Sequence, residues 1–121
     1  MTLKFYAALP VRSESPELNG GHITTMFSPL TGTGRWHTGE AERSGIVTAV
    51  EYWQGRNLTV AIVKCKYAEQ RHSYWFEQGF RYDYAYRPHV SIGAGDSTRE
   101  LRHLVGARFV TEREFARLFT R

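Results

Sequence analysis

"NLTVAIVKCK", residues 57–66, is the stretch that decides the fold class. It is rich in β-branched side chains, which favour strands, and successive side chains of a strand point to opposite faces. Both faces of this run are apolar or small: one carries Leu58, Val60 and Ile62, and the other carries Thr59, Ala61, Val63 and Cys65. A strand that is apolar on both faces is buried on both sides, so the stretch predicts a central strand of a sheet.

Further strands are expected on either side of this run. "IVTAVEYW" (46–53) is also β-branched, and the three residues between the two runs, 54–56, are typical of a hairpin. We predict other strands over 3–9, where Pro10 ends the first strand, over 22–27 and over 89–93. In the tail 107–121, apolar and polar residues alternate from Phe115 to Phe119, which favours a strand over a helix.

Two helices are expected beside the sheet. Residues 67–80 change to a spacing of three and four, which places one face against the sheet: Ala68, His72, Trp75, Phe76 and Gly79. Ser97 and Glu100 form a possible capping box that opens a short helix, 98–105. Residues 28–45 hold four glycines and read as a long mobile loop. We therefore expect one α+β domain over 1–121, with mostly antiparallel strands and two helices.

Composition limits the classes of function. The 121 residues are 41% apolar and 23% charged, which is typical of a soluble globular protein. No apolar run approaches the roughly 20 residues of a membrane span, so we expect a cytoplasmic protein without membrane contact. The net charge is +4, and the thirteen arginines outnumber three lysines, which suits phosphate ligands but also fits a coding bias. The lone Cys65 reads as a core residue, and the histidines and carboxylates lack metal-site spacing, so we expect neither metal nor cofactor.

Two short motifs carry the chemistry. "HITT" (22–25) and "HVSI" (89–92) each place a histidine two residues before a hydroxyl, directly after a turn-forming residue. Residues two apart share one face of a strand, so neighbouring strands would bring two imidazoles and two hydroxyls together. One neutral and one protonated histidine can move the two protons of a phosphodiester cleavage, and hydroxyls can bind the phosphate oxygens. The alternative is that both are strand-end histidines bonded to loops.

The remaining histidines are less distinctive. His72 is expected to be packed on the first helix, and His37 is expected to be a solvated loop residue. Arg87 lies two residues before the second motif, where it could bind an anionic substrate.

The paired motifs resemble those of the two-histidine (2H) phosphoesterase superfamily. The short chain, the first strand "KFYAAL", the stretch "YRPHVSIG" and the hairpin that carries Trp53 are most similar to its compact phage branch, the anti-CBASS phosphodiesterases. The resemblance implies a bilobal fold with one motif in each lobe. It makes His22 and His89 catalytic, and Thr24 and Ser91 ligands of phosphate, although Ser91 departs from the commoner threonine.

The resemblance also implies a substrate and a mechanism. The enzyme would cleave cyclic di- or trinucleotide immune signals without a metal, in the host cytoplasm if a phage encodes it. A ribose 2′-hydroxyl would attack the adjacent phosphate, and Tyr6 and, less strongly, Trp53 would stack on bases. Two alternatives stay open: a phosphodiesterase that acts on RNA ends or 2′,3′-cyclic phosphates, with short RNA as partner, and a non-catalytic protein that sequesters nucleotides. The sequence leaves open the oligomeric state and which histidine is the base.

Overall fold

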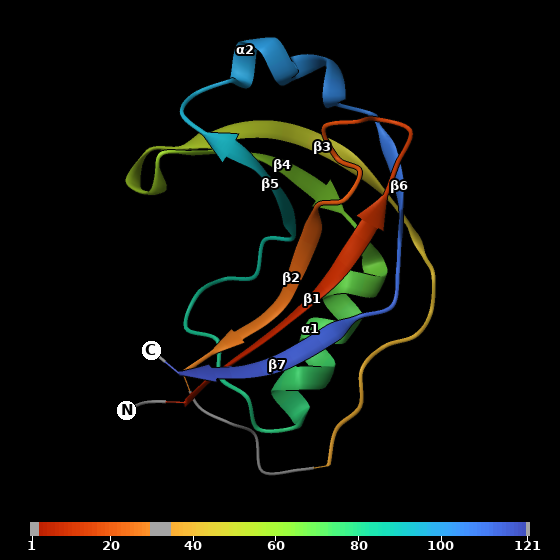
Figure 1. Cartoon of the computed structure of the whole chain (residues 1–121), viewed down its shortest axis with the longest axis vertical. Coiled ribbons are helices and arrows are strands. Elements are labelled where there is room, and N and C mark those ends of the chain that lie inside the picture. The colour runs from red at the N-terminus through yellow and green to blue at the C-terminus, as the bar shows by residue number, and fades with distance from the viewer. Residues whose placement is uncertain (1–2, 30–34, 121) are drawn as a thin grey trace.

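The computed structural model describes residues 3–29 and 35–120, which form an α+β fold (Figure 1). In chain order the elements are β1 (Leu3–Arg12), β2 (His22–Ser28), β3 (Ser44–Trp53), β4 (Leu58–Lys64), α1 (Lys66–Glu77), β5 (His89–Ala94), α2 (Thr98–Leu101), β6 (Arg108–Thr111) and β7 (Phe115–Thr120). Short 3-10 turns occupy Gln54–Arg56 and Arg102–Leu104. The expected antiparallel sheet and two helices are confirmed, and the tail is extended as predicted but forms two strands, β6 and β7, instead of one. None of the helices in the described part of the chain is long and apolar enough to cross a membrane.

The seven strands pair antiparallel in the order β2-β5-β4-β3-β6-β1-β7, and β1 also pairs with β2, so that the sheet closes on itself. The β4 strand lies between β3 and β5, and its residues from Thr59 to Val63 are all buried. The prediction that this run forms a central strand is therefore confirmed. Cys65 is also buried, as expected of a core residue.

The ring of strands has two narrow seams. The register between β2 and β5 consists of the single pair Ile23–Val90, and that between β1 and β6 consists of Val11–Thr111 and Arg12–Val110. The longer ladders lie within two groups of strands: β1 with β2 and β7, and β3 with β4 and β5. In Figure 1 the first group occupies the lower part of the molecule beside α1, and the second group lies above it beside α2.

The first strand does not end at Pro10 as predicted but continues to Arg12. On one side β1 pairs with β7 as far as Ala8 and with β6 only from Val11 onward. The carbonyl of Pro10 faces this gap, where it accepts a hydrogen bond from the Glu112 amide (2.8 Å). In an antiparallel strand the nitrogen points to the same side as the carbonyl, so the missing N–H of proline costs no ladder bond here.

Both helices depart from their predicted limits. The first runs over 66–77 and ends in a Schellman motif, in which Gly79 (φ 93°) donates to the Phe76 carbonyl and Phe80 donates to that of Trp75. Its buried face includes Arg71 and excludes Phe76, which is 48% exposed. The second helix stops at residue 101.

The predicted capping box at Ser97 is wrong. The Ser97 side chain makes no capping bond, and the Asp96 carboxylate instead accepts bonds from the backbone amide and the hydroxyl of Thr98. An aspartate can thus satisfy the free amides of a helix start one residue before the position that the motif predicts.

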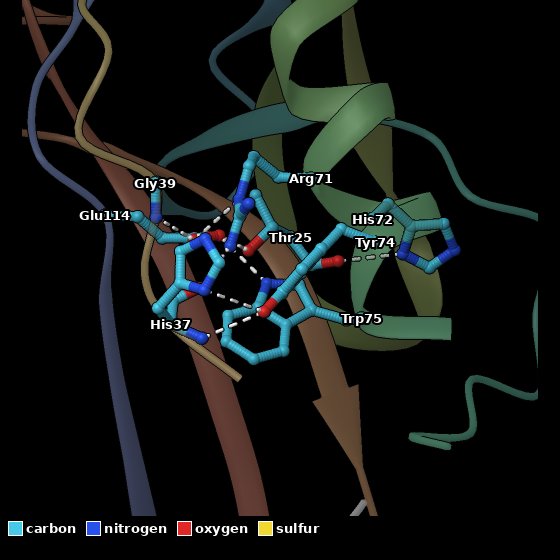
Figure 2. A network of polar contacts seen from close by, with 8 residues as sticks. All are labelled: Thr25, His37, Gly39, Arg71, His72, Tyr74, Trp75 and Glu114. Atoms are coloured by element: carbon cyan, nitrogen blue, oxygen red, sulfur yellow. Dashed lines mark hydrogen bonds and ion pairs between the residues drawn. The ribbon is translucent and has the colours of Figure 1, made fainter. Parts of the chain in front are cut away.

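The segment 35–43 has no regular secondary structure but is bound to the core through Glu114 (Figure 2). The Glu114 carboxylate is 2% exposed and accepts four hydrogen bonds. They come from the Gly39 amide (2.9 Å), Nε of Arg71 (2.9 Å), the Thr25 hydroxyl (2.6 Å) and Nε1 of Trp75 (2.9 Å). One carboxylate therefore joins this segment, α1, β2 and the β6–β7 turn. The other part of the predicted mobile loop, 30–34, lies outside the described residues.

Glu114→Gln is expected to lower the free energy of unfolding by about 3 kcal/mol, because it leaves the buried Arg71 guanidinium unpaired and turns an amide NH₂ toward donors. Urea denaturation measures the change. The matched control is Glu40→Gln, which removes an ion pair with Arg113 whose side chains are both 73% exposed, and it should change stability by less than about 1 kcal/mol. Equal effects of the two substitutions would contradict the role given to Glu114.

Candidate functional site

The pair Ile23–Val90 places both histidine motifs on one face of the sheet. Both side chains are fully buried in the same apolar cluster. Because side chains alternate along a strand, the residues on either side of each point to the opposite face. In an antiparallel register centred on Ile23 and Val90, His22 lies across from Ser91 and Thr24 lies across from His89. This register places the histidine of each motif toward the hydroxyl of the other, and all four side chains line one pocket.

Gly21 makes this close crossing possible. A Cβ atom at Gly21 would lie 2.6 Å from Cγ1 of Val90, which is closer than two carbon atoms can approach. The glycine in front of the first motif is therefore a packing requirement of the seam between β2 and β5.

The ring of His89 is held in one orientation. Its Nδ1 lies 2.8 Å from the Arg87 carbonyl, which can only accept, so Nδ1 carries the proton and Nε2 stays available in the neutral ring. The Trp53 ring packs edge-on at 4.5 Å between centroids. Burial lowers the pKa of His89, and the positive charges of Arg56 and Arg87 lower it further, against the opposing effect of the Arg87 carbonyl.

His22 lies in a second aromatic corner. The rings of Tyr6 and Phe115 approach it edge-on at 6.0 and 6.2 Å between centroids. This partial burial lowers the pKa of His22, and the nearby charge of Arg117 lowers it further. Both motif histidines thus favour the neutral form more than a free imidazole does.

Thr24 links the motif to two tyrosines. Its hydroxyl donates a long hydrogen bond to the Tyr6 phenol oxygen (3.4 Å), and its carbonyl accepts one from the Tyr86 hydroxyl (2.7 Å). The second bond fixes the segment 81–88 to β2. Ser91, across the seam from His22, is exposed toward the same side.

A pocket of about 780 Å³ lies over this face. All seven residues singled out from the sequence line it: Tyr6, His22, Thr24, Trp53, Arg87, His89 and Ser91. Its walls come from β1, β2 and β5, from the β3–β4 turn and from the segment 81–88. The volume is in the range of sites for small ligands and cofactors.

Arg87 lines the pocket, yet its guanidinium already has a partner. Nη1 and Nη2 donate to the two carboxylate oxygens of Glu51, at 2.9 and 2.8 Å. Glu51 also accepts a bond from Nε1 of Trp53 (3.1 Å), and the two donors lower its pKa. Glu51 was missed by the sequence analysis, although its place two residues before Trp53 puts both on one face of β3.

The segment 81–88 was also missed as a wall of the pocket. Tyr82 and Tyr84 line it, and Tyr84 is 80% exposed. The sequence signal for this wall was the alternation of Tyr82, Tyr84 and Tyr86 shortly before the second motif. His72 is packed as expected: its ring stacks on Tyr86 at 4.0 Å between centroids and its Nδ1 donates to the Thr25 carbonyl. His37 is exposed, and its backbone amide donates to the Tyr74 hydroxyl (2.9 Å).

Within residues 3–29 and 35–120, no group of three or more histidine, cysteine or carboxylate side chains is arranged to hold a metal ion. The polar groups that line the pocket include two imidazoles, two aliphatic hydroxyls, three tyrosine phenols, the Asp83 carboxylate and three cations. Together they can exchange protons and bind anionic oxygen atoms.

Comparison with known proteins finds a match to one protein family. No curated protein sequence matches the chain. The model of the family described as "Anti-CBASS protein Acb1" matches residues 13–115, which include both histidine motifs and most of the sheet. Because this match covers well over half of the sequence, the chain belongs to the Acb1 family of anti-CBASS proteins.

Proposed function

We propose that this protein is a metal-independent phosphodiesterase that cleaves 3′,5′-linked cyclic di- or trinucleotide immune signals. Membership of the Acb1 family indicates an anti-CBASS function. The observation that carries the proposal is the register Ile23–Val90, which turns two imidazoles and two hydroxyls toward one pocket. One proton acceptor and one proton donor on the two sides of a phosphate are what such a cleavage requires.

In the proposed reaction the substrate supplies its own nucleophile. The ribose 2′-oxygen attacks the phosphorus on the neighbouring 3′-oxygen while a neutral histidine takes its proton. The bond between phosphorus and the 5′-oxygen of the next nucleotide breaks, and the protonated histidine gives that oxygen its proton. The products are an opened chain and a 2′,3′-cyclic phosphate, which water can hydrolyse with the two histidines in exchanged roles. Thr24 and Ser91 donate hydrogen bonds to the non-bridging oxygens, where negative charge develops.

The walls of the pocket suit a ligand with bases as well as phosphates. Tyr6 and Trp53 each lie beside one of the motif histidines, in positions from which they can stack on bases next to the scissile phosphate. Stacking on an aromatic ring stabilises a bound base by roughly 1–3 kcal/mol and tolerates different bases. Arg87 contributes by orienting His89 through its carbonyl, and its guanidinium lines the pocket while paired with Glu51.

The same proposal includes a 2H-like fold. Two groups of strands meet at narrow seams, and each group contributes one motif at the β2–β5 seam. This arrangement supports two lobes related by their motifs, within one domain that spans the chain. The protein would act in the cytoplasm of the infected host.

We expect cleavage of a cyclic ribodinucleotide in EDTA, because the two histidines supply both proton transfers. The 2′-deoxy analogue should not be cut, since it lacks the nucleophile. A linear RNA that ends in a 2′,3′-cyclic phosphate serves as the third substrate, and mass spectrometry identifies the products.

Equal cleavage of the deoxy analogue would remove the internal attack. Activity confined to the RNA end would assign the protein to RNA processing, and tight binding of the cyclic dinucleotide without turnover would make it a sequestering protein.

His22→Ala and His89→Ala are each expected to lower the rate by about 10²–10⁴-fold, because each removes one proton-transfer group. Thr24→Val and Ser91→Ala should lower it less, since each removes one neutral donor. His103→Ala is the matched control, because His103 bonds to Glu17 and does not line the pocket. Rates are compared among variants whose circular dichroism matches the wild type. A near-wild-type rate in either motif variant would contradict the mechanism.

The pH dependence of kcat/KM is expected to be bell-shaped, with its alkaline limb below the ordinary histidine pKa of 6.5, because burial and arginine charges lower the pKa of both histidines. Above that limb the acid histidine has lost its proton. A bound phosphate favours the protonated ring, so the profile of kcat should lie at higher pH. Arg117→Gln should move the alkaline limb to higher pH, because it removes a positive charge that lowers the pKa of His22. Arg99→Gln should leave the limb unchanged. A kcat/KM that rises steadily through pH 8 would contradict this assignment.

A further inference from the structure

The cations that line the pocket differ in whether a carboxylate of the protein neutralises their charge. Lys4, Arg56 and Arg87 all line it. Arg87 gives both terminal nitrogens to Glu51, so much of its charge is neutralised. Arg56 is exposed and has neither an ion pair nor a side-chain hydrogen bond within the described residues, and Asp83, the carboxylate among the lining residues, is not bonded to it.

The backbone that carries Arg56 is well anchored. Arg56 ends the 3-10 turn between β3 and β4, and Asn57 follows in the left-handed conformation (φ 48°). The Asn57 side-chain oxygen accepts a bond from the Tyr52 hydroxyl (2.6 Å), and its carbonyl accepts one from the Gly95 amide (3.0 Å). The turn is therefore tied to β3 and to the end of β5, the strand that carries the second histidine motif.

The guanidinium lies near the reacting groups but does not bond to them. Its central carbon is 6.0 Å from the centre of the Trp53 ring, and the His89 ring also packs against that indole, at 4.5 Å between centroids. The indole thus contacts both the unpaired cation and one motif histidine. The charge of Arg56 also acts on Tyr82, on the segment 81–88 that forms another wall of the pocket.

We propose that Arg56 binds a second phosphate of the same substrate, the one that is not being cleaved. This inference rests on the proposed function. A cyclic oligonucleotide carries at least two phosphodiesters, separated by a nucleoside whose base can stack on Trp53. With one phosphate between the histidines, the next along the ring meets the unpaired guanidinium, whose planar fork matches two phosphate oxygens. The pocket then favours ligands with two or more phosphates over ligands with one.

Lys4 is the other cation without a carboxylate partner in the described part of the pocket lining. It lies over Phe27, 5.7 Å from the ring centre, on the wall that carries Tyr6. Arg56 is the better candidate because its charge is close to His89 and because its fork is specific for paired oxygens.

The test measures binding and needs no turnover. Calorimetry compares a 2′-deoxy cyclic dinucleotide, which has two phosphates, with the matching linear 2′-deoxy dinucleoside monophosphate, which has one. Arg56→Gln should weaken binding of the cyclic probe by about tenfold or more and leave the linear probe within about twofold. Arg56→Lys keeps the charge without the fork and should fall between. Arg99→Gln on α2, away from the pocket, is the matched control and should leave both affinities unchanged.

The outcomes separate this subsite from the proposed reaction. The subsite would be overturned if Arg56→Gln bound the cyclic probe as tightly as the wild type does. It would also be overturned if the substitution weakened the binding of both probes equally. Neither result bears on cleavage by the wild type. A wild-type protein that binds the cyclic probe through Arg56 but does not cut the ribose form would overturn the proposed hydrolysis and keep the subsite.

Discussion

The contact between Ile23 and Val90 is the constraint on which the site depends. It is the register pair that joins β2 to β5, and it closes the ring of strands between the two motifs. The two apolar side chains are driven into the core, which forces their neighbours, histidines and hydroxyls, to the other face. A bulkier residue than glycine at position 21 would hold the strands apart. Burial of two aliphatic residues thus sets the geometry of the polar groups around them.

Three arginines of this protein show how one residue type takes different roles through its neighbours. Arg71 is buried against Glu114 and stabilises the junction of α1, β2 and the segment 35–43. Arg87 pairs with an exposed carboxylate and orients a motif histidine through its backbone. Arg56 is left without a carboxylate, in the pocket. The basic composition is compatible with phosphate binding, but only the tertiary contacts separate a structural cation from one that is free to meet an anion.

Local patterns predicted the strands well, because the alternation of side chains along each strand agrees with which residues are buried. The run 57–66 is apolar on both faces and is central, and both motifs begin strands as expected. The predictions fail where contacts with a segment far away in the chain determine the local structure. Pro10 is tolerated because it lies in the gap between two ladders of β1: the pairing with β7 ends at Ala8, and the pairing with β6 begins at Val11. The residues around Pro10 do not reveal this gap. Asp96 replaced Ser97 as the capping side chain because several oxygens compete for the same free amides.

The sequence by itself determined the composition of the site: two histidines and two hydroxyls at a spacing of two, with an aromatic on the first strand and another on the hairpin. That follows from the strict alternation of a strand, which is a local property. The tertiary structure alone decided that the motifs face each other crosswise, that Glu51 neutralises Arg87, and that the tyrosines of 81–88 form a wall. These contacts join residues far apart in the chain, and their partners are selected by the closure of the sheet, which local sequence does not specify.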